Sequence, residues 1–116
     1  MTITLANLKD ATTQQVFDQV RDHLLKQQKR SVTGDRCLYR SGNNKCAAGC
    51  LIADDEYNSN MDSGASGWHE LIQDDIVPST HHDDFIVCLQ EIHDVVPACN
   101  WSAELTILAK EYNLEP

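Results

Sequence analysis

The stretch that decides the fold is Cys37-Leu38-Tyr39-Arg40-Ser41-Gly42-Asn43-Asn44-Lys45-Cys46-Ala47-Ala48-Gly49-Cys50-Leu51-Ile52. It holds three of the chain's five cysteines and two of its five glycines. The turn Ser41-Gly42-Asn43-Asn44 separates two short runs, which is the pattern of a β-hairpin. The apolar residues after Lys45 predict one or two helical turns buried beneath the hairpin, where Gly49 indicates a close approach of two backbone segments.

The residues before the hairpin predict the first of three longer helices. Apolar side chains recur at helical spacing from Val16 to Leu25. Thr12 and Gln15 fit a capping box, in which each side chain accepts a hydrogen bond from the other residue's backbone N–H. The pattern therefore predicts a helix over residues 12–28, with its polar face toward water.

Two further helices are expected after the hairpin. The first starts at a second capping-box pattern, Thr80 with Asp83, and ends before Pro97, because proline cannot continue a helix. The second carries a clean apolar stripe from Trp101 to Tyr112.

These patterns predict a mostly helical α+β fold, with about three longer helices around a short central β-hairpin. With 116 residues and 41% hydrophobic content, the chain is expected to form a single globular domain over residues 1–116. No apolar run reaches the length of a membrane span, and the N-terminus lacks the pattern of a signal peptide. We therefore expect a cytoplasmic protein with reduced thiols; the odd number of five cysteines also argues against a closed disulfide framework.

Charge is divided unevenly along the chain. Residues 1–45 carry eight Lys or Arg and four Asp or Glu, whereas residues 46–109 carry twelve Asp or Glu and no Lys or Arg. The net charge of −9 argues against direct nucleic-acid binding, which needs a basic footprint. It permits electrostatic steering toward the basic surface of a protein partner. A general soluble acidic surface, or two halves that neutralise each other in the folded state, would give the same pattern.

The candidate partner-binding residues are carboxylates of the acidic portion, residues 54–94. They are Asp54, Asp55, Glu56, Asp62, Asp74, Asp75, Asp83 and Asp84. Our leading hypothesis for function is a small acidic accessory protein that binds another protein and inhibits or modulates it by occluding its surface. This mechanism needs carboxylates on one face of the molecule, which the sequence alone does not define.

The competing hypothesis places a metal site at Cys37, Cys46 and Cys50. Zinc needs soft ligands that converge tetrahedrally, and a hairpin can bring Cys37 opposite Cys46, with Cys50 one helical turn further on. The fourth ligand would come from Cys88, His69, His81 or His82. The C-x8-C-x3-C spacing lacks the usual C-x2-C pair, however, and free cysteines often pack as small hydrophobic side chains. Structural zinc and buried core thiols are therefore both open.

A reactive thiol is the third interpretation. Cys46 precedes Ala47-Ala48-Gly49, which could place it at a helix N-terminus, where the dipole lowers the pKa of a thiol. His93 falls on the apolar face of its expected helix, as a hydrogen-bonded core histidine does, and Asp94 is expected in a cap or a salt bridge. The chain has no glycine-rich phosphate loop, no G-x-S-x-G and no H-E-x-x-H. The sequence therefore assigns no catalytic residue.

Several of these residues carry a resemblance to other proteins. The run Cys37-x-Tyr39-Arg40, then Lys45-Cys46-Ala47-Ala48-Gly49-Cys50-Leu51-Ile52 and Tyr57, resembles a group of small bacteriophage, prophage and bacterial proteins. Ile92-His93-Asp94 and Trp101 are similar to them as well. The resemblance covers nearly the whole chain and implies an intracellular, phage- or prophage-encoded protein. If the protein is a phage factor, the leading hypothesis makes a host enzyme or defence system the partner that it modulates. It transfers neither an activity nor a catalytic residue.

Overall fold

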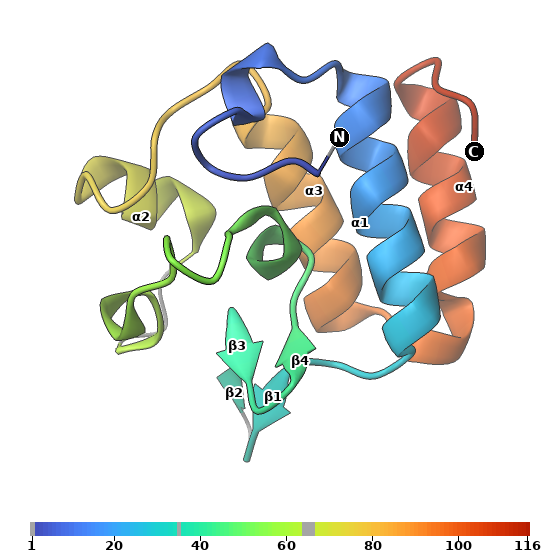
Figure 1. Cartoon of the computed structure of the whole chain (residues 1–116). Coiled ribbons are helices and arrows are strands. Elements are labelled where there is room, and N and C mark those ends of the chain that lie inside the picture. The colour runs from blue at the N-terminus through green and yellow to red at the C-terminus, as the bar shows by residue number, and fades with distance from the viewer. Residues whose placement is uncertain (1, 35, 64–66) are drawn as a thin grey trace.

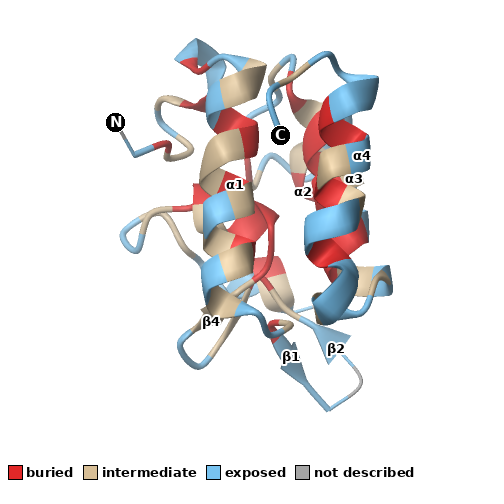
Figure 2. Cartoon of the chain, turned by 90° about the vertical axis from the view of Figure 1, so that its right-hand side faces the viewer, coloured by how far each residue is buried: buried red, intermediate tan, exposed pale blue. Residues whose placement is uncertain are grey.

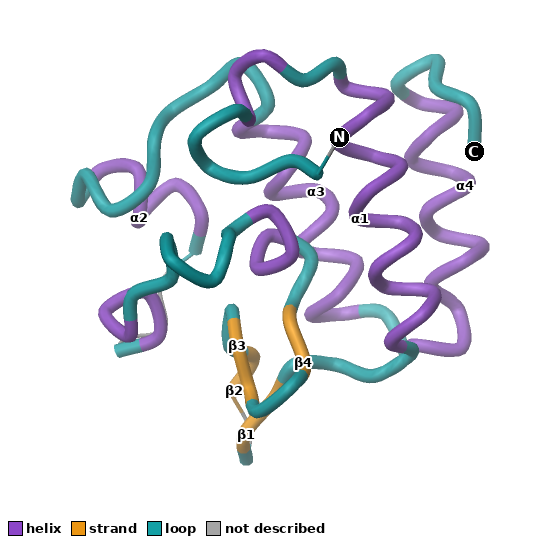
Figure 3. Tube along the Cα trace, in the orientation of Figure 1, coloured by secondary structure: helices purple, strands orange, loops and turns teal. Residues whose placement is uncertain are grey.

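The computed structural model describes residues 2–34, 36–63 and 67–116, and its fold is mostly helical α+β (Figures 1 and 3). The α-helices are α1 (Thr13–Gln27), α2 (Trp68–Gln73), α3 (Asp83–Val95) and α4 (Trp101–Glu111). The strands are β1 (Val32–Thr33), β2 (Arg36–Cys37), β3 (Arg40–Ser41) and β4 (Asn44–Lys45). Short 3-10 helices are η1 (Leu8–Asp10), η2 (Ala48–Leu51), η3 (Ser59–Asp62) and η4 (Ala98–Asn100). The predicted fold class, with three longer helices, is confirmed.

The three longer helices form one half of the molecule. α4 packs against both α1 and α3, while η2 lies against α1 and α3 and α2 lies against α3 (Figure 1). Figure 2 shows that the buried residues of the helices face inward, toward one another. The largest fully buried side chains include Trp68, Trp101 and Phe17, and burial of one large apolar side chain contributes about 1.5–3 kcal/mol.

Helix α1 follows the sequence-based expectation closely. The Thr12 hydroxyl accepts from the Gln15 N–H at 3.1 Å, and the Gln15 side chain accepts from the Thr12 N–H at 2.9 Å. The predicted capping box is therefore present, and the helix begins and ends within one residue of the predicted bounds. None of the helices in the described part of the chain is long and apolar enough to span a membrane.

Helix α3 starts later than the capping pattern predicts. Its N-cap is His82, and the Thr80 hydroxyl accepts from the His82 N–H at 3.1 Å rather than from Asp83. Only the return bond of the box forms, from the Thr80 N–H to the Asp83 carboxylate at 2.9 Å. The buried His82 ring explains the shift, because its Nε2 donates to the Ala11 carbonyl oxygen at 2.7 Å and holds this turn against the N-terminal segment.

The described part of the chain forms two small hairpins, where the sequence predicted one. The predicted hairpin is present as β3–β4, with Gly42 at a φ of 59° in its turn. A second hairpin, β1–β2, precedes it and turns at Gly34, which has a φ of 61°. The Ser41 hydroxyl joins the two hairpins, because it lies 2.8 Å from both the Val32 carbonyl oxygen and the Thr33 hydroxyl.

The segment beneath the hairpins is packed as tightly as the sequence indicates. Gly49 in η2 is buried, and a Cβ at this position would collide with the carbonyl oxygen of Tyr39. The predicted close approach of two backbone segments is thus present, and only glycine fits without movement of the chain.

Candidate functional site

The three cysteines of the metal hypothesis lie in two different environments. Cys46 precedes the turn η2 and Cys50 lies within it, and Cys46 Sγ accepts from the Gly49 N–H at 3.2 Å. Cys50 Sγ donates to the Ala47 carbonyl oxygen at 3.1 Å. Cys37, in contrast, is exposed on β2.

Burial keeps the two thiols of the turn protonated. It raises the pKa of Cys46 well above its ordinary value, and it raises the pKa of Cys50 to about 12. A cysteine must be a thiolate to act as a nucleophile or to bind zinc, so the environment opposes both roles. The shift for Cys46 is opposite in direction to the one that a helix N-terminus would give.

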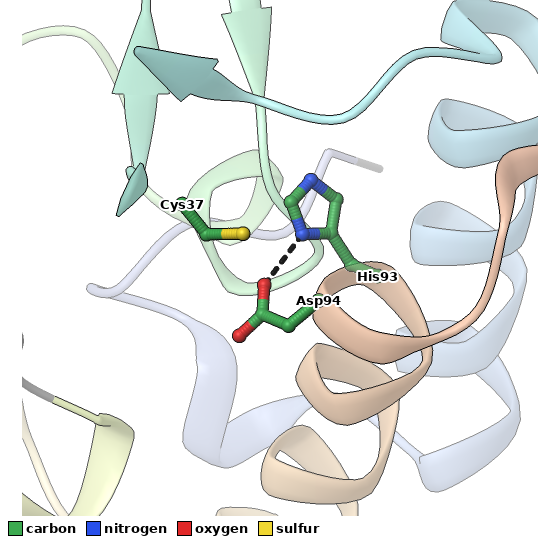
Figure 4. Close-up of side chains that lie close together, drawn as sticks. All are labelled: Cys37, His93 and Asp94. Carbon is green, nitrogen blue, oxygen red and sulfur yellow. Dashed lines mark hydrogen bonds and ion pairs between the residues drawn. The ribbon is translucent and has the colours of Figure 1, made fainter. Parts of the chain in front are cut away.

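The structure brings Cys37 next to two side chains from the end of α3. One potential ligand atom from each of Cys37, His93 and Asp94 lies within 4.8 Å of the other two (Figure 4). No other group of three or more His, Cys, Asp or Glu in the described part of the chain is as close. Cys46, Cys50 and the suggested fourth ligands are therefore outside this cluster.

Hydrogen bonds determine the protonation of His93. Its Nε2 lies 2.9 Å from the Ser31 backbone nitrogen, and its Nδ1 lies 2.7 Å from Asp94 Oδ1. A backbone N–H can only donate, so Nε2 accepts and the ring proton is on Nδ1, which donates to the carboxylate. The ring is fully buried and stacks on Trp101 with a centroid separation of 5.6 Å. The expectation of a hydrogen-bonded core histidine is confirmed.

This tautomer makes the cluster a poor metal site. A metal bound at Nδ1 would need the lone pair that now carries the proton, and Nε2–H would then face the Ser31 N–H. Two donors facing each other at a buried position leave both hydrogen bonds unmade. The three residues therefore fit a metal only if the contact between His93 and Ser31 is broken first.

The cluster does not activate the Cys37 thiol either. Partial desolvation of the sulfur by its neighbours, followed by the charge of Asp94 and a hydrogen bond to it, raises the pKa of Cys37, whereas the positive charge of Arg30 opposes the shift. Nε2 of His93 is occupied by the Ser31 N–H and is not free to take a proton from the thiol. The arrangement of Cys, His and Asp thus lacks both a thiol with a lowered pKa and a free base that could deprotonate it.

Asp94 presents one carboxylate oxygen at the surface. Its Oδ1 accepts from His93 and from the Gln90 side chain at 2.9 Å. Figure 4 shows the other carboxylate oxygen pointing away from both the imidazole and the thiol. The side chain is 36% exposed, so one negatively charged oxygen is held in a fixed orientation at the surface.

Three of the eight predicted partner-binding residues accept hydrogen bonds within the fold. Glu56 accepts from three backbone N–H groups, those of Leu5, Ala6 and Ala53, at 2.9–3.0 Å. Asp62 accepts from the backbone N–H groups of Tyr39 and Arg40 and from the Tyr57 hydroxyl at 2.7, 3.3 and 2.6 Å. Asp83 accepts from the Thr80 N–H and the Ser79 hydroxyl. These carboxylates hold the fold together.

The other five carboxylates are exposed. Asp54 forms ion pairs with Arg40 at 2.8 Å and Lys45 at 3.7 Å, and Asp84 lies 3.4 Å from His69. The remaining three, Asp55, Asp74 and Asp75, have no side-chain hydrogen bond or ion pair with the described residues. Asp55 follows η2 in the chain, and Asp74 and Asp75 directly follow α2.

Sequence reasoning did not connect His93 with Ser31 and Cys37, which are more than fifty residues away in the chain. The apolar spacing around His93 was the signal that it is buried. Comparisons of the chain with protein-family models, with curated proteins and with solved structures found no match.

Proposed function

We propose that this chain is an acidic accessory protein that binds the basic surface of a protein partner and acts by covering it. The observation that carries the proposal is a set of three exposed carboxylates, Asp55, Asp74 and Asp75, which have no ion pair with the described residues and lie on a segment without any Lys or Arg. Carboxylates without an internal partner remain able to form ion pairs across an interface.

The charge layout supports association rather than chemistry. Residues 46–109 have twelve acidic and no basic side chains, so electrostatic attraction should raise the rate of association with a basic surface. Salt should reduce this rate, because it screens the attraction. The resemblance to phage and bacterial proteins suggests a host enzyme or defence protein in the cytoplasm as the partner. Binding would then block that surface without a chemical step.

A metal- or thiol-dependent role is the second candidate. Its favourable observation is the proximity of Cys37, His93 and Asp94, and Cys46 and Cys50 would take part only after leaving their internal hydrogen bonds. A native mass spectrum of freshly purified, reduced protein separates the two candidates. A mass excess of one zinc that disappears on acidification, and is lost in Cys37→Ser, supports the second candidate.

Binding to a basic partner is tested by affinity capture from host lysate, followed by titration of the captured protein after purification. We expect the identified partner to have a basic surface and to elute with moderate salt. The variant Asp55→Asn/Asp74→Asn/Asp75→Asn should bind it at least about tenfold more weakly, since each exposed ion pair contributes up to about 1 kcal/mol.

The matched control removes the same charge elsewhere. Asp10, Glu111 and Glu115 are exposed, and their substitution by Asn, Gln and Gln leaves the proposed surface intact. Equal loss of binding in both triple variants, or binding that salt does not weaken, would contradict the proposal.

A further inference from the structure

We propose that a groove between α2 and α3 holds an arginine or lysine side chain of the partner. The inference rests on the proposed function and assigns an anchoring site to it. The groove has a volume of about 280 Å³, and its lining includes Trp68, Val87, Glu91, Asp94 and Val95. It adjoins the His93 cluster through Asp94.

The walls of the groove are apolar and accessible. Val95 is 70% exposed although it lies on the same helix as the core residues of α3, and Val87 is partly buried beside it. A basic side chain has a stem of three or four methylene groups, which gains from contact with apolar surface while its charged end stays polar. The two valines suit the apolar stem of such a side chain, and the carboxylates near them suit its charged end.

The charges in the groove have one sign. Glu91 and Asp94 line it, and no Lys or Arg does. The Asp94 carboxylate is oriented before any ligand arrives, because His93 and Gln90 both donate to its Oδ1. Gln90 is itself held by the Ala48 N–H, which donates to its side-chain oxygen at 2.9 Å. Binding to a carboxylate that is already fixed loses less conformational entropy than binding to a mobile one.

The groove is also lined by a tryptophan whose donor is unpaired. Trp68 is 1% exposed, and its Nε1–H has no hydrogen-bond partner among the described residues. A buried donor without an acceptor costs about 1–3 kcal/mol, and this one reaches a ligand carbonyl only if the indole ring turns toward the groove. Because the ring lines the groove, its N–H signal reports on a ligand that binds there.

The probe for this site is the peptide acetyl-Gly-Gly-Arg-Gly-Gly-amide, with norleucine in place of arginine as the uncharged comparison. The chain has two tryptophans, so its two indole N–H signals can be followed in a proton–nitrogen correlation spectrum. Trp101 is the internal reference, because its Nε1–H already donates to the Val96 carbonyl oxygen at 2.9 Å. We expect the arginine peptide to shift the Trp68 signal and the norleucine peptide to leave it unchanged.

Two variants with the same change in charge make the result specific. Glu91→Lys should weaken binding of the arginine peptide about tenfold, since it replaces an attraction with a repulsion. Glu111→Lys lies on α4, outside the groove, and should weaken binding less than about threefold. Both residues are exposed, so both variants are expected to fold.

The outcomes distinguish this inference from the proposed function. If the peptide perturbs Asp55, Asp74 and Asp75 but not Trp68, or if both Lys variants lose affinity equally, the groove is not the anchor and acidic binding still holds. If neither this peptide nor the purified basic partner binds, both proposals fail. A Trp68 shift that Glu91→Lys abolishes supports the groove.

Discussion

Two regions near the hairpins contain thiols from the same stretch of sequence, and they differ in what they leave for function. In the buried turn, residues 46–52, both cysteines are hydrogen-bonded inside the protein and their thiols are held protonated. In the cluster of Cys37, His93 and Asp94, the imidazole is also fully used, but one carboxylate oxygen faces outward. The difference leaves a carboxylate oxygen, and not the two thiols of the buried turn, available at the surface, as the proposed binding of a basic partner requires.

Substitutions in the buried turn should lower the stability of the protein more than substitutions in the cluster. Gly49→Ala would push a methyl group into the Tyr39 carbonyl oxygen, and we expect the free energy of unfolding to fall by about 3 kcal/mol. Gly67→Ala is the matched control, since its Cβ would meet only the Glu70 side-chain oxygen, at an ordinary contact distance of 3.8 Å, and its φ is −78°. Urea unfolding of both variants measures the difference, and equal stability would show that the backbones are not in close contact.

Removal of the imidazole tests the other region. His93→Leu leaves the buried Ser31 N–H without an acceptor and takes a donor from Asp94, so we expect a loss of about 2 kcal/mol. His69→Ala, at an exposed position, should change stability by less than about 0.5 kcal/mol. If His93→Leu is as stable as the wild type, the hydrogen bond between His93 and Ser31 does not stabilise the packing of the hairpins against α3.

A pair of thiol substitutions compares the two regions directly. Cys46→Ser puts a hydroxyl into a fully buried position and should cost about 1 kcal/mol, because a hydroxyl loses more hydration on burial than a thiol does. Cys37→Ser is at the surface and should change stability by less than about 0.5 kcal/mol. Thermal unfolding in reducing buffer would reveal a reversed order, which would place the larger structural role at Cys37.

The smallest expected effect concerns the reactivity of Cys37. Its raised pKa means that at pH 8 a smaller fraction is thiolate than in an ordinary cysteine, and the fraction rises only at higher pH. We therefore expect iodoacetamide to modify Cys37 more slowly than it modifies a model peptide at pH 8. Removing the nearby negative charge with Asp94→Asn should speed the reaction, as measured by peptide mass spectrometry. Faster reaction of the wild type would indicate an activated thiol.

Local pattern predicted much of the helical half. The capping box of Thr12 and Gln15 and the apolar periodicity locate α1 to within a residue, since both depend on neighbours in the chain. The start of α3 was wrong because the His82 ring bonds to Ala11, seventy-one residues away. The β1–β2 hairpin was missed because strands of two residues show no alternation.

The candidate site was only partly predictable for the same reason. Spacing identified His93 as a core residue, but the tautomer depends on the backbone N–H of Ser31, which only the folded chain brings near. Composition identified the excess of acid, yet it could not separate Glu56 and Asp62, which accept hydrogen bonds internally, from Asp55 at the surface. The sequence gives the number of carboxylates but does not show which of them accept hydrogen bonds inside the folded protein.

The tautomer of His93 tests the central claim most directly, because the cluster can serve structure or bind metal but cannot do both unchanged. A long-range proton–nitrogen spectrum of the histidines, recorded at neutral pH before and after addition of equimolar zinc, reports which ring nitrogen carries the proton. We predict a neutral His93 with its proton on Nδ1 and no change on adding zinc. A proton on Nε2, or a zinc-induced shift of the Nδ1 signal, would contradict the account and return the cluster to metal chemistry.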